Sequence, residues 1–297
     1  MSGGMSAEPE GEQAEEPLAG GRTTAGVVRV GETVRRPRRP WTSSVHSVLR
    51  HLEEGGFTGA PRVLGFDDAG REVLAYLNGE TVGDALPWPE WVSSDAALTD
   101  VGRWLRRLHD VTADFVPARR AIWFPPRDWQ PGHVIGHHDA APYNAVWRQG
   151  QLVGFVDWDL AGPTSRDFDL AYTALMWVPL LAPDSEWPIA CHGQDESYRR
   201  LHLLLDAYRY VDDRSPLRTA VAARARRGSE VIRRLADDGD PMFQERRGQA
   251  DDLDRAAQHV EDLPDAFGGP QQPTSTSAQS RSRPRDLRRW QSRRRHG

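Results

Sequence analysis

Short apolar runs separated by turn residues open the chain and predict strands. The runs at residues 27–30 and 33–36 flank Gly-Glu and predict a β-hairpin that ends at Pro37. The runs at 62–65 and 72–77 predict two further strands around a second turn. This part of the sequence therefore predicts a small antiparallel sheet.

A helical period interrupts this pattern once and later replaces it. Inside the strand-rich part, Val45, Val48, Leu49 and Leu52 recur at i, i+3, i+4 and i+7, with residues 42–44 as candidate caps. The same period returns beyond Gly79, in the segments 98–109, 196–211 and 217–236. The predicted fold class is α+β, with two lobes: a small antiparallel sheet carrying one helix and a larger, mainly helical lobe.

A polar loop and a second hairpin interrupt the helical part of the chain. The loop reads His-His-Asp-Ala-Ala-Pro-Tyr-Asn over residues 137–144, and the hairpin runs on to Asp157. A symmetric turn at Gly150-Gln151 would place Asn144 and Asp157 opposite each other on one face, whereas a slip of one residue would separate them. Two such oxygen ligands suit Mg²⁺. Asp139, in the loop before the first strand, can accept the proton of a hydroxyl during phosphoryl transfer.

The sequence His137-x-Asp139-x4-Asn144, followed by Asp157, resembles the catalytic loop and metal-binding aspartate of the aminoglycoside phosphotransferase family, within the protein-kinase-like fold. The segment ending Asp-Phe-Asp-Leu-Ala at 167–171 is similar to the family's downstream segment, whose aspartate braces that loop. The resemblance implies an ATP-dependent small-molecule kinase that transfers the γ-phosphate to a hydroxyl. In that interpretation Asp139 is the catalytic base, Asn144 and Asp157 hold Mg²⁺, and His137 holds the loop through backbone hydrogen bonds.

The resemblance also implies where ATP binds. The segment 74–80 is similar to the hinge that holds adenine through backbone groups, here those of Ala75 and Leu77, and Gly20 and Gly21 would lie over the phosphates. The family's phosphate-binding lysine has no counterpart, because all 38 basic residues are arginine. We expect Arg35 in its place, with Arg36 as the alternative.

The partner glutamate of that lysine is also missing from the predicted helix. Val45 stands where the family places it, and Glu53 and Glu54 lie near the helix end. These two departures favour a rival interpretation, a catalytically weak, pseudokinase-like module that binds nucleotide and acts through a partner. The presence of Asp139, Asn144 and Asp157 together favours an enzyme.

A zinc hydrolase is a second alternative, because His133, His137, His138 and Asp139 are clustered. It would leave Asn144 and Asp157 without a role. The acceptor itself is a small molecule with a hydroxyl, aminoglycoside-like or other. The acidic body favours a cationic acceptor, and four acidic residues lie where the family builds its acceptor pocket: Asp184, Glu186, Asp195 and Glu196.

Charge and composition divide the chain into domains. The net charge is −5, yet the end of the chain is rich in arginine. We expect a disordered acidic N-terminus at 1–18, a nucleotide-covering lobe at 19–79, a helical lobe with the catalytic loop and acceptor site at 80–269, and a disordered tail at 270–297. Only the tail suits nucleic acid, since the acidic body argues against a nucleic-acid-binding domain. The lack of a long apolar run or a signal segment predicts a cytoplasmic protein without membrane contact, and no pattern indicates an oligomeric state.

Overall fold

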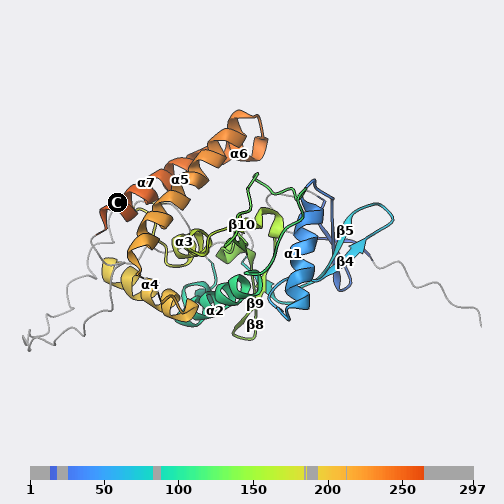
Figure 1. The fold of residues 1–297 in the computed structure, drawn as a ribbon, viewed down its shortest axis with the longest axis horizontal. Coiled ribbons are helices and arrows are strands. Elements are labelled where there is room, and N and C mark those ends of the chain that lie inside the picture. The colour runs from blue at the N-terminus through green and yellow to red at the C-terminus, as the bar shows by residue number, and fades with distance from the viewer. Residues whose placement is uncertain are drawn as a thin grey trace, which may run out of the picture.

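The computed structural model describes residues 14–18, 26–82, 88–183, 185, 193–211 and 213–263. A sheet with one packed helix occupies one end of the molecule, and a group of helices occupies the other (Figure 1). The α+β class and the division into a sheet-bearing and a helical part are confirmed.

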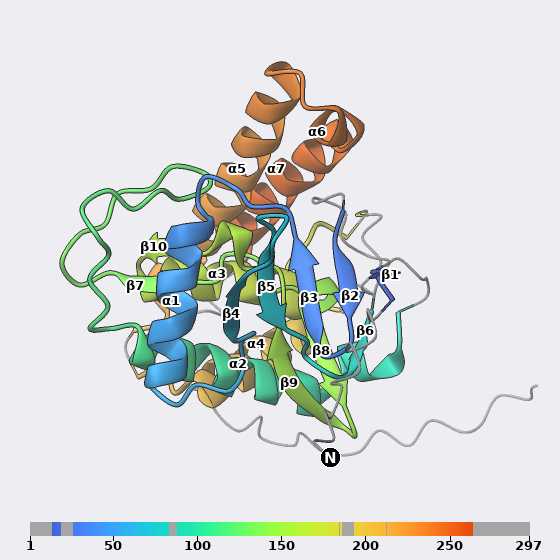
Figure 2. The same cartoon turned by 90° about the vertical axis from the view of Figure 1, so that its right-hand side faces the viewer.

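Five antiparallel strands form the larger sheet, in the order β1-β2-β3-β5-β4 (Figure 2). The strands are β1 (Glu16–Pro17), β2 (Val28–Val30), β3 (Thr33–Arg36), β4 (Val63–Phe66) and β5 (Glu72–Ala75). The expected hairpin is present as β2 and β3, with Val30 paired with Thr33. Gly31 lies in the turn between them with a φ of 57°, a conformation that glycine adopts without steric cost.

The disorder expected for residues 1–18 is wrong for residues 14–18. Strand β1 pairs with β2, and the Leu18 N–H donates to the carbonyl of Val27 at 3.2 Å. Glu15 also accepts a hydrogen bond of 2.7 Å from Arg71. Backbone pairing along a sheet edge orders this short segment although it buries little apolar surface. The rest of the expected acidic terminus and the whole arginine-rich tail lie outside the described residues.

Helix α1 (Thr42–Glu54) packs beside this sheet through the apolar face predicted from its period. Val48, Leu49 and Leu52 are all buried on that face. The helix begins without a side-chain cap, because its N-cap residue is Trp41 rather than one of the hydroxyl residues that follow. It ends at Gly55, where a Cβ would lie 2.5 Å from Val111.

The second predicted hairpin is present with a different register. Its strands are β8 (Ala145–Arg148) and β9 (Gln151–Phe155), and β6 (Glu80–Thr81) pairs with β8. The turn lies one residue earlier than the symmetric turn that we predicted, at Gln149-Gly150, and a bulge shifts the register between Val146 and Trp147. Ala145 therefore pairs with Phe155, and the Asn144 carbonyl accepts from the Val156 N–H at 2.9 Å. The strand pairing expected between Asn144 and Asp157 is wrong.

The helical part is built around α2, whose inward face is fully buried. The helices are α2 (Asp95–Val111), α3 (Arg166–Trp177), α4 (Gln194–Tyr208), α5 (Ser215–Asp237), α6 (Pro241–Glu245) and α7 (Arg247–Asp262). Short 3₁₀ turns are η1 (Glu90–Ser93), η2 (Pro142–Asn144) and η3 (Trp158–Leu160), and β7 (Val134–Gly136) pairs with β10 (Gly162–Thr164). Helices α5 and α7 lie side by side and project from the body, with α6 at their far end (Figure 1, Figure 2).

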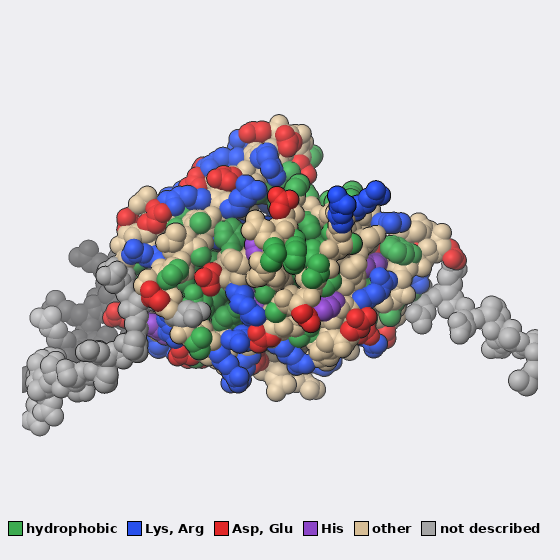
Figure 3. Space-filling view, in the orientation of Figure 1, with side chains coloured by type: hydrophobic (Ala, Val, Ile, Leu, Met, Phe, Trp, Pro, Cys, Tyr) green, Lys and Arg blue, Asp and Glu red, His purple; other side chains and the backbone are tan. Residues whose placement is uncertain are grey.

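One face of the molecule carries both signs of charge without segregation (Figure 3). Figure 3 shows arginines and carboxylates interspersed over one face, with apolar side chains exposed between them. Within the described ranges, no helix is both long enough and apolar enough to cross a membrane.

Candidate active site

A loop braced by one buried carboxylate follows β7. The Asp169 carboxylate, at the start of α3, accepts the backbone N–H of His137 at 3.2 Å and that of His138 at 2.8 Å. The His109 side chain on α2 holds the same carboxylate at 3.0 Å. A Cβ on Gly136 would lie 2.6 Å from the Asp169 side chain, so only glycine fits there. Asp169 thus fixes the backbone that leads into Asp139.

Burial and hydrogen bonding set the charge states in this loop. Burial alone would raise the pKa of Asp169, but the hydrogen bond from His109, the neighbouring His138 and the backbone donors outweigh it and lower that pKa well below the ordinary value. Burial lowers the pKa of His137 to about 4, so this ring is neutral near pH 7. Its Nε2 bonds the Val156 carbonyl at 3.1 Å, and its Nδ1 accepts from the Asp139 N–H at 3.2 Å. Both ring nitrogens of His137 therefore form hydrogen bonds with backbone groups.

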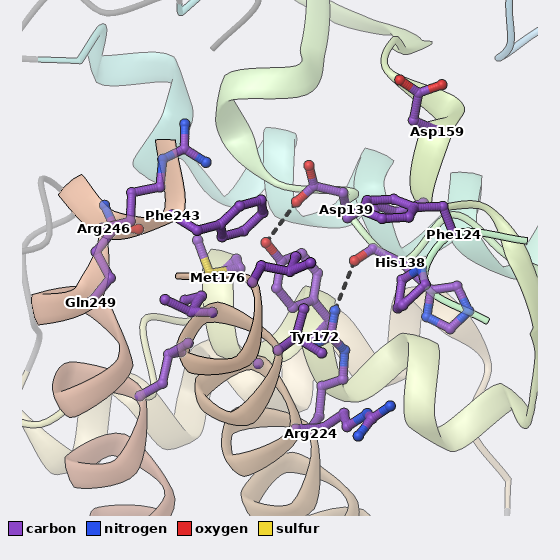
Figure 4. Close-up of a pocket in the computed structure, with 18 of the residues that line it drawn as sticks. Phe124, His138, Asp139, Asp159, Tyr172, Met176, Arg224, Phe243, Arg246 and Gln249 are labelled. Carbon is purple, nitrogen blue, oxygen red and sulfur yellow. Dashed lines mark hydrogen bonds between the residues drawn. The ribbon is translucent and has the colours of Figure 1, made fainter. Parts of the chain in front are cut away.

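The Asp139 side chain is half-buried and accepts three hydrogen bonds. Tyr143 and Tyr172 each donate a hydroxyl to Oδ1 at 2.7 Å, and the Asn144 amide donates to Oδ2 at 2.8 Å. A carboxylate offers about four lone-pair positions, so one position is left for a further donor. Burial raises the pKa of Asp139, while the hydrogen bonds from Tyr172, Tyr143 and Asn144 oppose that rise. Figure 4 shows the bond between Asp139 and Tyr172.

Asn144 and Asp157 line one cavity although they are not strand partners. The Asn144 amide nitrogen is bound to Asp139, which leaves its oxygen available as a ligand. Asp157 follows β9 with a φ of 61°, in the left-handed region that costs a non-glycine residue about 1 kcal/mol or more. Strained backbone of this kind concentrates at functional sites.

The structure brings Arg36, rather than Arg35, into this cavity. Successive side chains of β3 point to opposite faces of the sheet, so only one of the two can face the cleft. Arg35 lies 3.8 Å from Asp67, outside the cavity, whereas Arg36 is buried in its wall. The geometry therefore favours the alternative that the sequence left open, and the expectation for Arg35 finds no support.

Arg36 lies among three carboxylates. Its Nε is 2.9 Å from Glu72, its Nη1 is 3.8 Å from Asp157, and its Nη2 hydrogen-bonds Asp159. Burial alone would lower the pKa of Arg36, but Asp159, Asp157 and Glu72 together raise it. The guanidinium thus joins the sheet to the segment that carries Asp157.

Glu72 supplies the acidic partner that is missing from helix α1. It pairs with Arg36 across β3 and β5, and its other carboxylate oxygen lies 2.8 Å from His46 on α1. The helix is therefore linked to Arg36 through a strand residue, rather than carrying the glutamate itself. The sequence signal was the polar Glu72 at the start of an apolar strand, but its partner is a cross-strand neighbour that periodicity alone does not identify.

Two cavities meet at this loop. One, of about 190 Å³, lies between the sheet and the loop, and both Ala75 and Leu77 line it. The other, of about 430 Å³, lies between Asp139 and helices α3, α5, α6 and α7. Three residues line both cavities: Tyr143, Asp157 and Asp159. A ligand bound in one cavity would therefore lie next to a ligand bound in the other.

The remaining sequence expectations fall outside these cavities or outside the described residues. Gly20 and Gly21 are not among the described residues, and neither are Asp184 and Glu186. The other two residues expected near an acceptor, Asp195 and Glu196, lie in the first turn of α4, where Glu196 binds Arg199. They do not line the larger cavity.

The zinc alternative finds no support in the described part of the chain. It contains no group of three or more histidine, cysteine, aspartate or glutamate side chains placed to hold a metal ion. His137 and His138 each bond a backbone carbonyl through Nε2, at 3.1 and 3.2 Å.

The two-part fold, the braced loop and the paired cavities define a phosphotransferase of the kinase-like class. Residues 118–204 match the model of the phosphotransferase enzyme family. The trifolitoxin immunity protein of Rhizobium leguminosarum bv. trifolii is 42% identical over 197 residues, which cover 64% of this chain and 71% of that protein. The chain belongs to the phosphotransferase enzyme family, as the resemblance in its sequence indicated.

Solved structures share the fold at low sequence identity. A choline/ethanolamine kinase family protein from Mesorhizobium loti superposes with a TM-score of 0.57 at 18% identity, covering 86% of this chain and 91% of that one. An amicoumacin kinase in complex with AMP-PNP and Ca²⁺ gives 0.55 at 12% identity, covering 86% and 89%. These likenesses confirm the kinase-like two-lobed fold.

Proposed function

We propose that this protein transfers the γ-phosphate of ATP to a hydroxyl of a small molecule. The observation that carries the proposal is the meeting of the two cavities beside Asp139, with Asn144 and Asp157 lining the smaller one. ATP would occupy the smaller cavity, with adenine at the backbone of Ala75 and Leu77. The acceptor would occupy the larger cavity.

Each residue has a role that its contacts support. Asp139, with one lone-pair position open, accepts the acceptor's hydroxyl proton as the oxygen bonds to the γ-phosphorus and ADP leaves. Arg36 faces the phosphates as a fixed cation, in place of a lysine. His137 stays neutral and holds the loop.

The donor set beside Asp139 fits Mg²⁺. An amide oxygen and a carboxylate, from Asn144 and Asp157, are hard ligands, and Mg²⁺ usually adds phosphate oxygens and water to one or two protein ligands. When bound, the ion neutralises charge on the phosphates. Arg36 contacts Asp157 and Asp159, and so orients the segment that would hold it.

The test compares wild type with Asp139→Asn, using ADP release with a panel of hydroxylated acceptors. We expect the variant to bind Mg-ATP normally and to lose turnover by about a hundredfold to ten-thousandfold, the usual contribution of a general base. Asp68→Asn, in an exposed turn, is the matched control and should keep full turnover. Equal turnover by wild type and Asp139→Asn would exclude the proposed base.

The immunity relative supports a use for this chemistry, the inactivation of a toxic compound by phosphorylation. Cells that express the wild-type chain should survive a toxin of the kind that the relative resists, and cells that express Asp139→Asn should not. Equal protection by the variant would instead favour the alternative of a catalytically weak, nucleotide-binding module that acts by binding. Protein levels of the two variants should be matched by immunoblot.

A further inference from the structure

The larger cavity has apolar walls and a polar floor. Residues from α3, α5, α6 and the segment before β7 supply its apolar lining, among them Phe124, Met176, Ile232 and Phe243. Figure 4 shows Phe243 and Met176 facing the space in front of Asp139. A volume of about 430 Å³ is in the range of small-molecule sites. These walls suit an acceptor with an apolar body.

Arg127 and Arg224 line this wall, and neither forms an ion pair with a carboxylate among the described residues. Arg224, on α5, donates to the His138 carbonyl at 2.9 Å and lies 4.3 Å from the centre of the Tyr172 ring (Figure 4). Arg127 packs over β10, where a Cβ on Gly162 would lie 2.9 Å from its Cδ. The Nε atoms of both arginines are buried and have no hydrogen-bond partner.

The two charges lie close enough to affect each other and the loop. Burial, reinforced by the positive charge of Arg224, lowers the pKa of Arg127 to about 10. Burial lowers the pKa of His138 well below its usual value, and both arginines add to that effect. The charge of Asp169 offsets part of both effects, but half-buried cations without an ion-pair partner remain unfavourable.

The carboxylates that line the same cavity already have partners. Asp157 and Asp159 contact Arg36, and Asp139 accepts from two tyrosines and Asn144. Asp240 caps α6 by accepting the N–H groups of Met242 and Phe243, and Asp252 pairs with Arg255. The charges of Asp139 and Asp169 act on Arg224 and Arg127, but none of these carboxylates forms an ion pair with either arginine.

We propose that the acceptor of this protein carries a carboxylate as well as its hydroxyl, and that Arg127 and Arg224 bind that carboxylate at the apolar cavity wall. A guanidinium carries its N–H donors in a fixed planar fork that matches the two oxygens of a carboxylate, which makes this the favoured anion. The inference rests on the proposed function, because it assumes that the hydroxyl meets Asp139. It replaces the cationic acceptor that the acidic composition suggested.

The test measures equilibrium binding by calorimetry, so that it does not depend on turnover. The probes are ω-hydroxyalkanoic acids of increasing chain length, their methyl esters and the matching amino alcohols, each with Mg²⁺ and a non-hydrolysable ATP analogue present. We expect at least one acid to bind about tenfold or more tightly than its ester and its amino alcohol, as a charge-assisted hydrogen bond allows.

The variants assign that preference to the two arginines. Arg127→Met and Arg224→Gln should each remove most of the tenfold difference between acid and ester while leaving affinity for the ester within about threefold. Arg226→Met, on the same helix but paired with Glu261, should keep the difference. Circular dichroism confirms that each variant is folded. If Arg224→Gln does not fold, the result for Arg127→Met alone decides the test.

Three results would overturn the inference: no acid binds more tightly than its ester, the amino alcohols bind best, or the preference survives in Arg127→Met. Failure of the proposed function looks different. In that case the acids bind with the arginine-dependent preference, but no ATP-dependent phosphorylation of any probe occurs and Asp139→Asn changes nothing.

Discussion

The two cavities that meet at Asp139 differ in how their arginines are paired with carboxylates. On the nucleotide side, Arg36 contacts Glu72, Asp157 and Asp159. On the acceptor side, the charges of Asp169 and Asp139 act on Arg127 and Arg224, but neither arginine forms an ion pair with a carboxylate within the described chain. A cation neutralised by the protein's own carboxylates positions those groups, whereas an unpaired cation costs stability that only a ligand offsets. In the proposed function, the contrast separates charge that builds the site from charge that would recognise a substrate.

Arg36→Met should have the largest effect on stability. It leaves Glu72, Asp157 and Asp159 facing one another without their cation, and breaking a buried ion pair in this way costs about 3 to 5 kcal/mol. Urea denaturation measures the free energy of unfolding. The variant should also bind Mg-ATP more weakly, as a fluorescent nucleotide analogue would report.

Arg35→Met is the matched control, because it changes the same residue type one position along the same strand. Its guanidinium lies 3.8 Å from Asp67 and is partly exposed, so we expect little change in stability or nucleotide affinity. If the two variants lost nucleotide affinity equally, the assignment of Arg36 to the phosphates would not stand.

The two histidine side chains of the loop between the two sides have lowered pKa values, and this predicts a pH dependence. The folded-state pKa of His137 is about 4, against about 6.5 when exposed, so the unfolded chain binds a proton that the folded chain does not. Stability should therefore be unaffected by this ring above pH 6.5. Below that value it falls by about 1.4 kcal/mol for each pH unit down to pH 4, or about 3 kcal/mol in all.

Urea denaturation across this range tests the assignment. His138, whose pKa is also lowered by burial, adds to the slope, while Asp169 loses its stabilising charge only below about pH 4, because its pKa is lowered. His137→Gln should be less stable at pH 7 but show a shallower decline between pH 6.5 and 4. An unchanged slope would mean that His137 takes up its proton in the folded protein.

The contrast between the two sides also explains what the sequence could predict. Asp139 and Asn144 belong to one short loop, so their spacing alone indicates that they lie close together, and the Asn144 amide does donate to the Asp139 carboxylate. The strand pairing predicted between Asn144 and Asp157 is wrong, although both residues line one cavity. A single-residue bulge in β9 changes the register, and a bulge leaves no trace in the side-chain pattern. Arg36 depends on which face of β3 is buried, which a short strand of four polar or β-branched residues does not fix.

The acceptor side was beyond sequence reasoning for a different reason. Arg127 lies in an irregular segment and Arg224 in a helix with many arginines, and nothing in either pattern indicates that they share a cavity. What distinguishes Arg224 from Arg226 is the direction of the side chain: one lies over Tyr172, and the other binds Glu261 on α7. Tertiary packing makes that distinction.

Arg127→Met should have the smallest effect and the opposite sign. Methionine keeps the apolar stem that packs over Gly162 and removes a half-buried charge whose Nε has no partner, so the free energy of unfolding should rise by about 1 kcal/mol. Thermal and urea unfolding of the ligand-free protein measure the change, and Arg226→Met, which loses the contact with Glu261, should not stabilise. A loss of stability as large as that of Arg36→Met would mean that Arg127 holds the fold together, and the two sides of the site would then no longer differ. A gain in stability would instead show that the protein keeps a destabilising charge in its acceptor cavity, which is the cost expected of a residue kept for binding.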